Sequence, residues 1–248
     1  MQLSRRMQRL ASLVTEGNRL ADVGTDHGYV PIALVRERKI PSAVAMDVNK
    51  GPLARAEEHI REAGLSTYIR LRRSDGLQEL QAGEADTILI AGMGGMLMVR
   101  ILEEGGHCLD MAEELILQPQ SDIYMVRRWL SEHRFQILLE DIVEEDGKYY
   151  PMLKAVHGQE RELTEPELYY GKREIQNSPQ ILRRCLQARL SENRKILGIL
   201  KQSQKEKTRR ACEIESSIKI INFVLAEFQG SEKSPDFFEE QTKGGNSL

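Results

Sequence analysis

The chain has 248 residues, 40% of them hydrophobic and 29% charged, and its formal net charge is −3. These values indicate a soluble globular protein with one large domain, or one domain and an appendage. No apolar run reaches the roughly 18 residues that a membrane span needs, and the N-terminus lacks a signal-peptide core, so we expect a cytoplasmic protein.

Residues 1–158 alternate apolar runs with helical patterns, after a first expected helix at residues 3–14. Strands are expected at residues 19–23, 42–47, 68–72, 86–91 and 114–117, and helices at 29–38, 52–64, from 95 onward and at 122–133. A closing hairpin is expected at residues 135–143 and 149–156. This order predicts an α/β fold, with a mostly parallel Rossmann-like sheet and an antiparallel edge hairpin.

The character of the sequence changes after Gly158. Two runs within residues 159–228 carry apolar residues at heptad spacing, which predicts an antiparallel pair of helices in a second domain. Asn193 falls on the apolar seam, where it would fix the register of the pair. We expect the turn between the helices at residues 203–208. The composition of residues 229–248 predicts a disordered tail.

Charge is distributed unevenly along the chain. Between Lys172 and Arg210 there are twelve basic residues and three acidic ones. Segregated positive charge is what a protein needs to bind a polyanion such as RNA, although a solvated helix surface shows the same pattern. The candidate contacts are Arg5, Arg6, Arg9, Arg183, Arg184, Arg194 and Lys195. The three cysteines lie far apart and predict neither a metal site nor a disulfide framework.

The most informative motif is the turn after the first expected strand, where an apolar run ends at Gly24 and a helical pattern starts at Tyr29. In open α/β sheets this turn binds nucleotide-like cofactors. A dinucleotide fingerprint has a bare glycine at the position of Asp26, because the backbone there approaches a pyrophosphate. A carboxylate would repel that phosphate. It would suit a cofactor with a cationic centre and no phosphate, such as S-adenosylmethionine.

Further residues at the expected strand ends could contact the same cofactor. Asp47 could accept hydrogen bonds from two ribose hydroxyls, and Gly24 would leave room for the cofactor. Asp22 could orient the cofactor's amino group or cap the loop. Asp75 could accept a hydrogen bond from an adenine amino group or form an Asx-turn. The predicted cofactor-binding residues are Asp22, Gly24, Asp47, Val48, Asp75, Gly76, Ala91 and Gly92.

The glycine-rich run at residues 92–95 follows the fourth expected strand, on the rim where ligands bind. Its glycines would let a flat base and a methyl donor approach the backbone, or would only give a helix a flexible entry. Met93 is expected to be a pocket wall, and Gly94 is expected to lie beside the substrate. Gln118 could bind a base edge or the loop backbone.

The candidate catalytic residues are Asp26, His27 and Tyr29. Asp26 is the best candidate for reading an adenine amino group or accepting a proton. A histidine in a loop such as His27 more often has a structural role. Tyr29 could stack on a base or only pack against neighbouring side chains.

Together these motifs resemble those of bacterial tRNA (adenine-N1)-methyltransferases that act on adenine 22, the TrmK family. The matching stretches are residues 3–7, 21–31, 51–52, 91–95 and 117–119, so the resemblance covers about residues 1–160. It implies a class I methyltransferase fold, S-adenosylmethionine as cofactor and a C-terminal coiled-coil domain that helps to hold tRNA. Two small-for-small departures are Thr25, where Ser is expected, and Gly28, where Ala is expected.

The implied reaction needs little from the protein beyond placement. Adenine N1 already has an in-plane lone pair, so catalysis reduces to aligning N1 with the methyl group and stabilising a cationic product. A carboxylate such as Asp26 could do the second task. The target base must leave its stack in tRNA to reach the pocket.

Three other functions were weighed against this one. The first is a methyltransferase that acts on a small molecule or protein, which the basic segment disfavours. The second is a non-catalytic RNA-binding protein with a degenerate cofactor fold, which a measurement of S-adenosylmethionine binding would test. A nucleotide-dependent oxidoreductase is disfavoured by Asp26. We expect no metal, and a monomer rather than an oligomer.

Overall fold

The computed structural model describes residues 3–172, 176–203 and 208–231. The chain divides into two compact units, Met1–Pro179 and Gln180–Leu248. The first unit ends later than the boundary after Gly158 that the sequence predicts.

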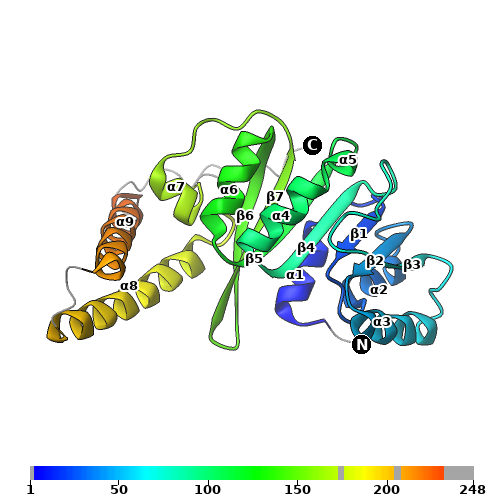
Figure 1. Cartoon of the computed structure of the whole chain (residues 1–248), viewed down its shortest axis with the longest axis horizontal. Coiled ribbons are helices and arrows are strands. Elements are labelled where there is room, and N and C mark those ends of the chain that lie inside the picture. Colours follow the sequence, from blue (N-terminus) through cyan, green and yellow to red (C-terminus); the bar gives the residue numbers. More distant parts are fainter. Residues whose placement is uncertain (1–2, 173–175, 204–207, 232–248) are drawn as a thin grey trace, which may run out of the picture. The chain divides into compact units, whose positions relative to one another are not determined.

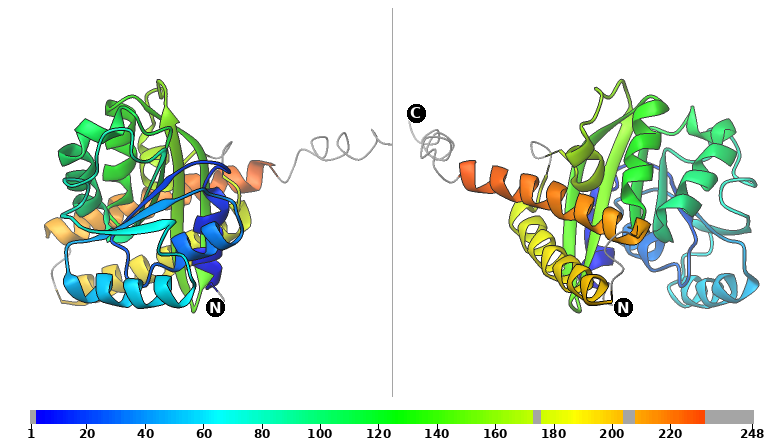
Figure 2. Two further views of the ribbon diagram at one scale, coloured as in Figure 1. Left: turned by 90° about the vertical axis from the view of Figure 1, so that its right-hand side faces the viewer. Right: turned by 60° about the vertical axis from the view of Figure 1, so that its left-hand side comes forward.

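The first unit is a seven-stranded sheet with helices on both faces (Figures 1 and 2). Its elements in chain order are α1 (Arg5–Leu13), β1 (Leu20–Val23), α2 (Tyr29–Arg36), β2 (Ala43–Asp47), α3 (Lys50–Glu62), β3 (Ile69–Arg73), β4 (Thr87–Gly94), α4 (Gly95–Glu104), α5 (Gly106–Leu109), β5 (Glu114–Ser121), α6 (Ile123–Glu132), β6 (Phe135–Glu145), β7 (Lys148–His157) and α7 (Glu165–Tyr170).

The strand order is β3-β2-β1-β4-β5-β7-β6. The first five strands pair in parallel, and β7 pairs antiparallel with both β5 and β6. The predicted parallel sheet with an antiparallel edge hairpin is confirmed. Chain order reverses between β1 and β4, and such a switch point opens a crevice at the carboxyl ends of the strands.

Two apolar cores lie on the two faces of the sheet. Helices α4, α5 and α6 cover one face, with Met98, Leu102 and Leu130 fully buried. Helices α1, α2 and α3 cover the other face, where Leu34 and Ala56 are fully buried. The continuous apolar runs of β1, β2 and β4 follow from this burial on both sides.

Strand β4 is longer than the sequence predicts, because it includes three residues of the glycine-rich run. Its pairing with β5 continues past Ala91 through irregular steps at Met93 and Gly94. Helix α4 then begins at Gly95. A Cβ on Gly95 would lie 2.5 Å from the backbone oxygen of Ser121 and 2.6 Å from that of Asp122. Glycine is therefore required here by close packing of two backbones.

Helix α1 is held in place by the hairpin of β6 and β7, which lies far from it in the sequence. Arg9 forms an ion pair with Asp141 of β6, and the backbone N–H of Arg6 donates to Glu145 at 3.3 Å. Lys154 of β7 donates through Nζ to the carbonyl of Leu13 at 2.8 Å. The first helix of the chain is thus fixed by the last two strands of the sheet.

The segment after β7 is tied to the first unit by buried charges. Arg127 donates to both carboxylate oxygens of Glu140, at 3.1 and 2.8 Å, and to the carbonyl of Leu168 at 2.9 Å. Lys172 is buried and donates to Glu160 at 2.8 Å. Lys172 therefore adds nothing to an exposed basic surface, although the sequence count includes it.

The second unit consists of α8 (Pro179–Gln202) and α9 (Arg209–Ser231), which lie side by side (Figure 2). Asn193 donates to the hydroxyl of Ser217 at 3.0 Å, so the seam position does join the two helices. The buried seam residues are Leu182, Leu186, Leu190, Ala211, Ile214, Ile221, Val224 and Phe228. That the pair supercoils stays a prediction.

Parts of the remaining predictions fall outside the described residues. These are most of the turn expected at residues 203–208, and residues 232–248 of the expected tail; helix α9 itself extends to Ser231. No helix in the described part of the chain has the length and apolar character to cross a membrane.

Candidate active site

The turn after β1 is anchored on the neighbouring strand. The backbone N–H groups of Gly24 and Thr25 both donate to the carbonyl of Met46, at 2.8 and 2.9 Å. Gly24 has a φ of +79°, and a Cβ at this residue would lie 2.1 Å from the methyl carbon of Met93. The left-handed backbone conformation therefore favours glycine here, whereas the flexible end of the Met93 side chain could move away from a Cβ. That Gly24 makes room for a cofactor stays a prediction.

A cavity of about 280 Å³ opens at the carboxyl ends of β1 and β4. It is lined by α1, by the turn at residues 24–30, by the end of β4 and by Gln120 of β5. The structure brings together here these predicted residues: Arg6, Asp22, Gly24, Asp26, His27, Tyr29, Ala91 and Gly92. This is the crevice at the switch point of the sheet.

Three side chains that line this cavity each hold a buried polar atom without a hydrogen-bond partner: Arg6 Nε, Thr25 Oγ1 and His27 Nδ1. Buried polar groups are nearly always satisfied, because leaving one unpaired costs about 1–3 kcal/mol. Such a cluster is typical of a site that receives a polar ligand. The donors and acceptors present fit an uncharged nucleoside carrying a cationic group.

Asp22 lies at the end of β1 on the wall of the cavity. Burial raises the pKa of its carboxyl from an ordinary value of 3.8 to about 6, and the charge of Asp47 adds to the shift. The Thr25 hydroxyl, which meets no partner at full hydrogen-bonding geometry, lies near enough to oppose part of it. A cation in the cavity would stabilise the charged form of Asp22. The carboxylate is therefore suited to bind an ammonium or sulfonium group.

The other predicted cofactor residues lie at neighbouring strand ends and do not line this cavity. Asp47 ends β2, and its Oδ1 accepts from the backbone N–H of Asn49 at 2.7 Å. Val48, next to it, is 45% exposed. Asp75 is exposed and accepts from Arg100 at 3.0 Å. The predicted adenine reader is thus engaged with α4.

Gly76 is packed under the same helix. A Cβ on Gly76 would lie 2.9 Å from a side-chain carbon of Ile101. Close packing between the loop and α4 therefore explains this glycine.

The candidate catalytic residues form a charged and aromatic cluster at the mouth of the cavity. The side chain of Asp26 is 60% exposed and forms an ion pair with Arg55 of α3. Its Oδ2 lies 3.3 Å from Nε2 of His27. The rings of His27 and Tyr29 stack with centroids 4.8 Å apart, and His59 of α3 stacks on both. Arg55 and His59 were not predicted, since both look like ordinary polar residues of an exposed helix.

The three N-terminal arginines have different surroundings. Arg6 lines the cavity, and its guanidinium lies 5.0 Å from the ring centroid of Tyr150. Arg9 is engaged by Asp141, so it serves the docking of α1. Arg5 is exposed.

Two glutamines of β5 have different surroundings. Gln118 is fully buried; its Oε1 accepts from Arg6 at 3.5 Å, and its amide donates to the carbonyl of Pro119 at 3.4 Å. Gln120, two residues on, lines the cavity instead. The two residues are two positions apart on one strand, and the sequence alone does not show which of them is buried. The side chain of Ser121 lies 3.2 Å from the Cβ position of Gly94.

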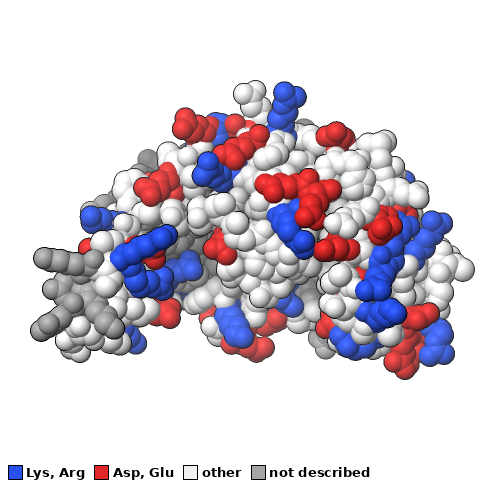
Figure 3. All heavy atoms as spheres, in the orientation of Figure 1, with Lys and Arg blue, Asp and Glu red and all other residues white. Residues whose placement is uncertain are grey.

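The predicted RNA contacts of the second unit lie on α8. Arg184, Arg194 and Lys195 are exposed, and Arg183 is half-buried. Arg194 and Lys195 line a groove of about 530 Å³. On the face in Figure 3, basic and acidic side chains are interspersed over the first unit, so that face alone does not present a basic surface.

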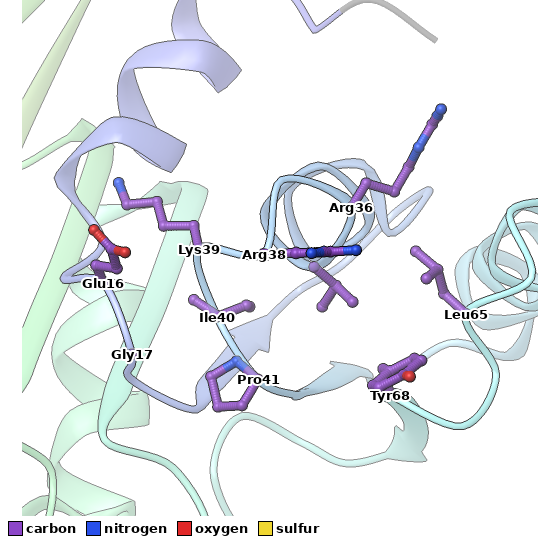
Figure 4. A pocket seen from close by; sticks show the side chains of 10 residues that line it. Glu16, Gly17, Arg36, Arg38, Lys39, Ile40, Pro41, Leu65 and Tyr68 are labelled. Carbon is purple, nitrogen blue, oxygen red and sulfur yellow. The ribbon is translucent and has the colours of Figure 1, made fainter.

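A larger hollow of about 790 Å³ lies at the opposite edge of the sheet, before β1 and β2. Figure 4 shows Arg36 pointing away from Tyr68 there. The Nζ of Lys39 is used by α1, since it donates to the carbonyls of Ala11 and Ser12 at 2.9 and 3.0 Å. None of the unpaired buried atoms of the described residues is on this hollow. The cavity at the carboxyl edge is therefore the candidate active site.

Comparison with known proteins identifies the family. Residues 3–153 match a family model described as a methyltransferase domain. The chain is 41% identical over 158 residues to the tRNA (adenine(22)-N(1))-methyltransferase of Bacillus subtilis (strain 168), an alignment that spans 64% of this chain and 66% of that protein.

Two solved structures share the architecture beyond the catalytic domain. One is that of Streptococcus pneumoniae Sp1610 in complex with S-adenosyl-L-methionine, with a TM-score of 0.80, 34% identity and coverage of 90% of this chain and 100% of that one. The other is the B. subtilis m1A22 tRNA methyltransferase TrmK, with a TM-score of 0.80, 31% identity and coverage of 90% and 99%. The chain belongs to the family of bacterial tRNA (adenine(22)-N(1))-methyltransferases.

Proposed function

We propose that this protein transfers a methyl group from S-adenosylmethionine to N1 of adenine 22 in tRNA. One observation carries the proposal: at the switch point of a class I methyltransferase fold, the half-buried carboxylate of Asp22 lines one cavity together with three side chains that each hold an unpaired polar atom. The proposal is supported by the family to which the chain belongs. A tRNA substrate also supports the predicted cytoplasmic location.

The cofactor side of the site is formed by strand ends. S-adenosylmethionine, when bound, supplies a methyl group on a cationic sulfur. Asp22 would bind the positive charge of the cofactor, and Asp47 would accept from its ribose. Gly92 leaves open space at the floor, because a Cβ there would have no neighbour nearer than 3.8 Å. These assignments follow from position and charge, and each is open to mutagenesis.

The acceptor side is formed by the turn at residues 26–29. Adenine N1 attacks with its own lone pair, so the protein has to place the base and stabilise the positive charge that develops on it. Asp26 offers an exposed carboxylate at the mouth of the cavity for that charge. His27 and Tyr29 offer ring surfaces on which the target base can stack.

Binding of tRNA would use both ends of the chain. Arg6 lies on the cavity, and Arg184, Arg194 and Lys195 are exposed on α8. Cations of this kind contact phosphates, which supply most of the affinity for nucleic acids. Residues 180–228 are therefore proposed to hold tRNA while the first unit carries the chemistry.

A single assay tests the proposal. Unmodified tRNA transcripts with adenine or guanine at position 22 are incubated with the protein and methyl-labelled cofactor, and the labelled nucleoside is mapped. We expect 1-methyladenosine at position 22 in the first transcript and background labelling in the second. Equal labelling of both transcripts, or label at another nucleotide, would overturn the assigned substrate position.

A further inference from the structure

Helix α3 contributes two side chains to the turn at residues 26–29, which we call the acceptor turn. We infer that Arg55 and His59 are positioning residues: Arg55 orients the carboxylate of Asp26, and His59 orients the rings of His27 and Tyr29. The inference rests on the proposed role of the acceptor turn in binding adenine. It assigns to α3 a part in the reaction that its exposed, polar sequence does not indicate.

The carboxylate of Asp26 is held at both oxygens. Arg55 donates to Oδ1 through Nε at 3.2 Å and through a second, shorter contact from Nη2. Oδ2 faces Nε2 of His27 at 3.3 Å. A carboxylate with a different partner on each oxygen has one preferred rotation. An ion pair as exposed as this one contributes little to folding stability, so its main consequence is orientation.

His59 holds the acceptor turn in two ways. Its Nδ1 lies 3.1 Å from the carbonyl oxygen of His27, and because a carbonyl only accepts, Nδ1 carries the hydrogen. Its ring also stacks on the rings of His27 and Tyr29, with centroids 5.3 and 5.1 Å away. With the His27–Tyr29 contact, the three rings form a closed group. Rotation of Tyr29 would have to break contacts with both histidines.

The helix itself is fixed against the turn. Arg55 and His59 are one helical turn apart, so they project from the same side of α3. Ala56 and Ile60, beside them, lie 3.5 and 3.6 Å from the Cβ position of Gly28. Both are fully or almost fully buried. The side chains of Arg55 and His59 therefore extend from a rigidly packed helix, which is what a positioning role requires.

A double-mutant cycle tests the action of Arg55 through Asp26. The rate constant of single-turnover methylation is measured at saturating cofactor and tRNA for Arg55→Met, Asp26→Asn and the double variant. We expect each single variant to be slower by about tenfold or more, since small misplacement of a reacting group is costly. We expect the double variant to be no slower than Asp26→Asn, because Arg55 then has no charge to orient. Arg55→Lys should recover part of the rate.

Two variants of His59 separate its hydrogen bond from its stacking. His59→Asn keeps an N–H donor for the carbonyl of His27 and loses the ring, whereas His59→Phe keeps the ring and loses the donor. We expect both to lower the single-turnover rate several-fold, with the dissociation constant for S-adenosylmethionine within about twofold of the parent. The matched control is Arg61→Met, an exposed position of the same helix. It should retain the parental rate.

The outcomes distinguish this inference from the proposed function. If Asp26→Asn retains the parental rate, the role proposed for Asp26 fails and the inference about Arg55 fails with it. If Asp26→Asn is slow but Arg55→Met is as fast as the parent, or the two losses multiply, the acceptor turn is catalytic and Arg55 does not position it. If the His59 variants lose rate only in proportion to a lowered melting temperature by circular dichroism, His59 is merely structural.

Discussion

Asp22 is expected to lower the stability of the folded protein at neutral pH, and Asp22→Asn is expected to raise it. The pKa of the carboxyl is raised from 3.8 to about 6 in the folded chain, mainly by burial. The folded protein therefore binds this proton more tightly than the unfolded chain does. As the pH rises through this window the unfolded chain loses its proton first, so the contribution of Asp22 to stability falls with rising pH.

The size of the effect follows from the shift. A shift of roughly 2 pKa units at about 1.4 kcal/mol each gives a cost of about 3 kcal/mol, which is complete above about pH 7 and absent below pH 3.8. Asp22→Asn removes the charge and keeps the shape. It should stabilise the protein by up to about 3 kcal/mol at pH 7.5 and by little at pH 4.

Denaturant unfolding of parent and variant at both pH values measures this difference, because other titrating groups are common to the two proteins. Asp110→Asn, at an exposed carboxylate, is the control and should show no pH-dependent gain. The same substitution should weaken ligand binding. Calorimetry should show that Asp22→Asn binds S-adenosylmethionine at least about tenfold more weakly than the parent. An equal stability change at both pH values would refute the buried-charge argument, and parental ligand affinity would refute the cofactor contact.

Three further predictions concern other parts of the chain. Asp47→Ala should weaken S-adenosylmethionine binding by about 1–3 kcal/mol through lost ribose hydrogen bonds, and unchanged calorimetric affinity would reject that role. Reversing charge at Arg194 and Lys195 to Glu should weaken tRNA binding and flatten its salt dependence in gel-shift titrations at two salt concentrations; parental affinity with a parental circular dichroism spectrum would contradict the assigned contact surface. Glu140→Ala should destabilise the first unit by about 3–5 kcal/mol in urea unfolding, because it leaves the buried guanidinium of Arg127 without its counter-ion, and a loss below about 1 kcal/mol would contradict this.

Much of the fold was predictable because it depends on local patterns. Apolar runs and turn residues predicted the strands, and the first βα turn predicted the edge at which the cavity lies. Motif residues that adjoin a strand end, such as Asp22 and Asp26, line that cavity. Their positions follow from the topology of a parallel sheet.

The misses have a common cause, since each depends on a side chain from a distant element. Arg55 and His59 reach the acceptor turn only because α3 packs beneath Gly28. Gln118 was named as a candidate and Gln120 was not, although Gln118 is bonded to Arg6 and Gln120 lines the cavity. Lys172 was counted as surface charge, although Glu160 pairs with it in the interior. No periodicity in a single sequence reports such pairings.

The docking of α1 also has a consequence for synthesis on the ribosome. Helix α1 supplies Arg6, Met7 and Leu10 to the cavity, yet it is held by β6 and β7, which are the last strands of this unit to be made. At roughly 5–20 residues per second, the first helix waits on the order of ten seconds for its partners to emerge. A nascent chain therefore lacks a complete site until its hairpin leaves the exit tunnel. Ribosome-bound chains stalled before β6 should fail to retain S-adenosylmethionine, although every strand of the parallel sheet has already been made.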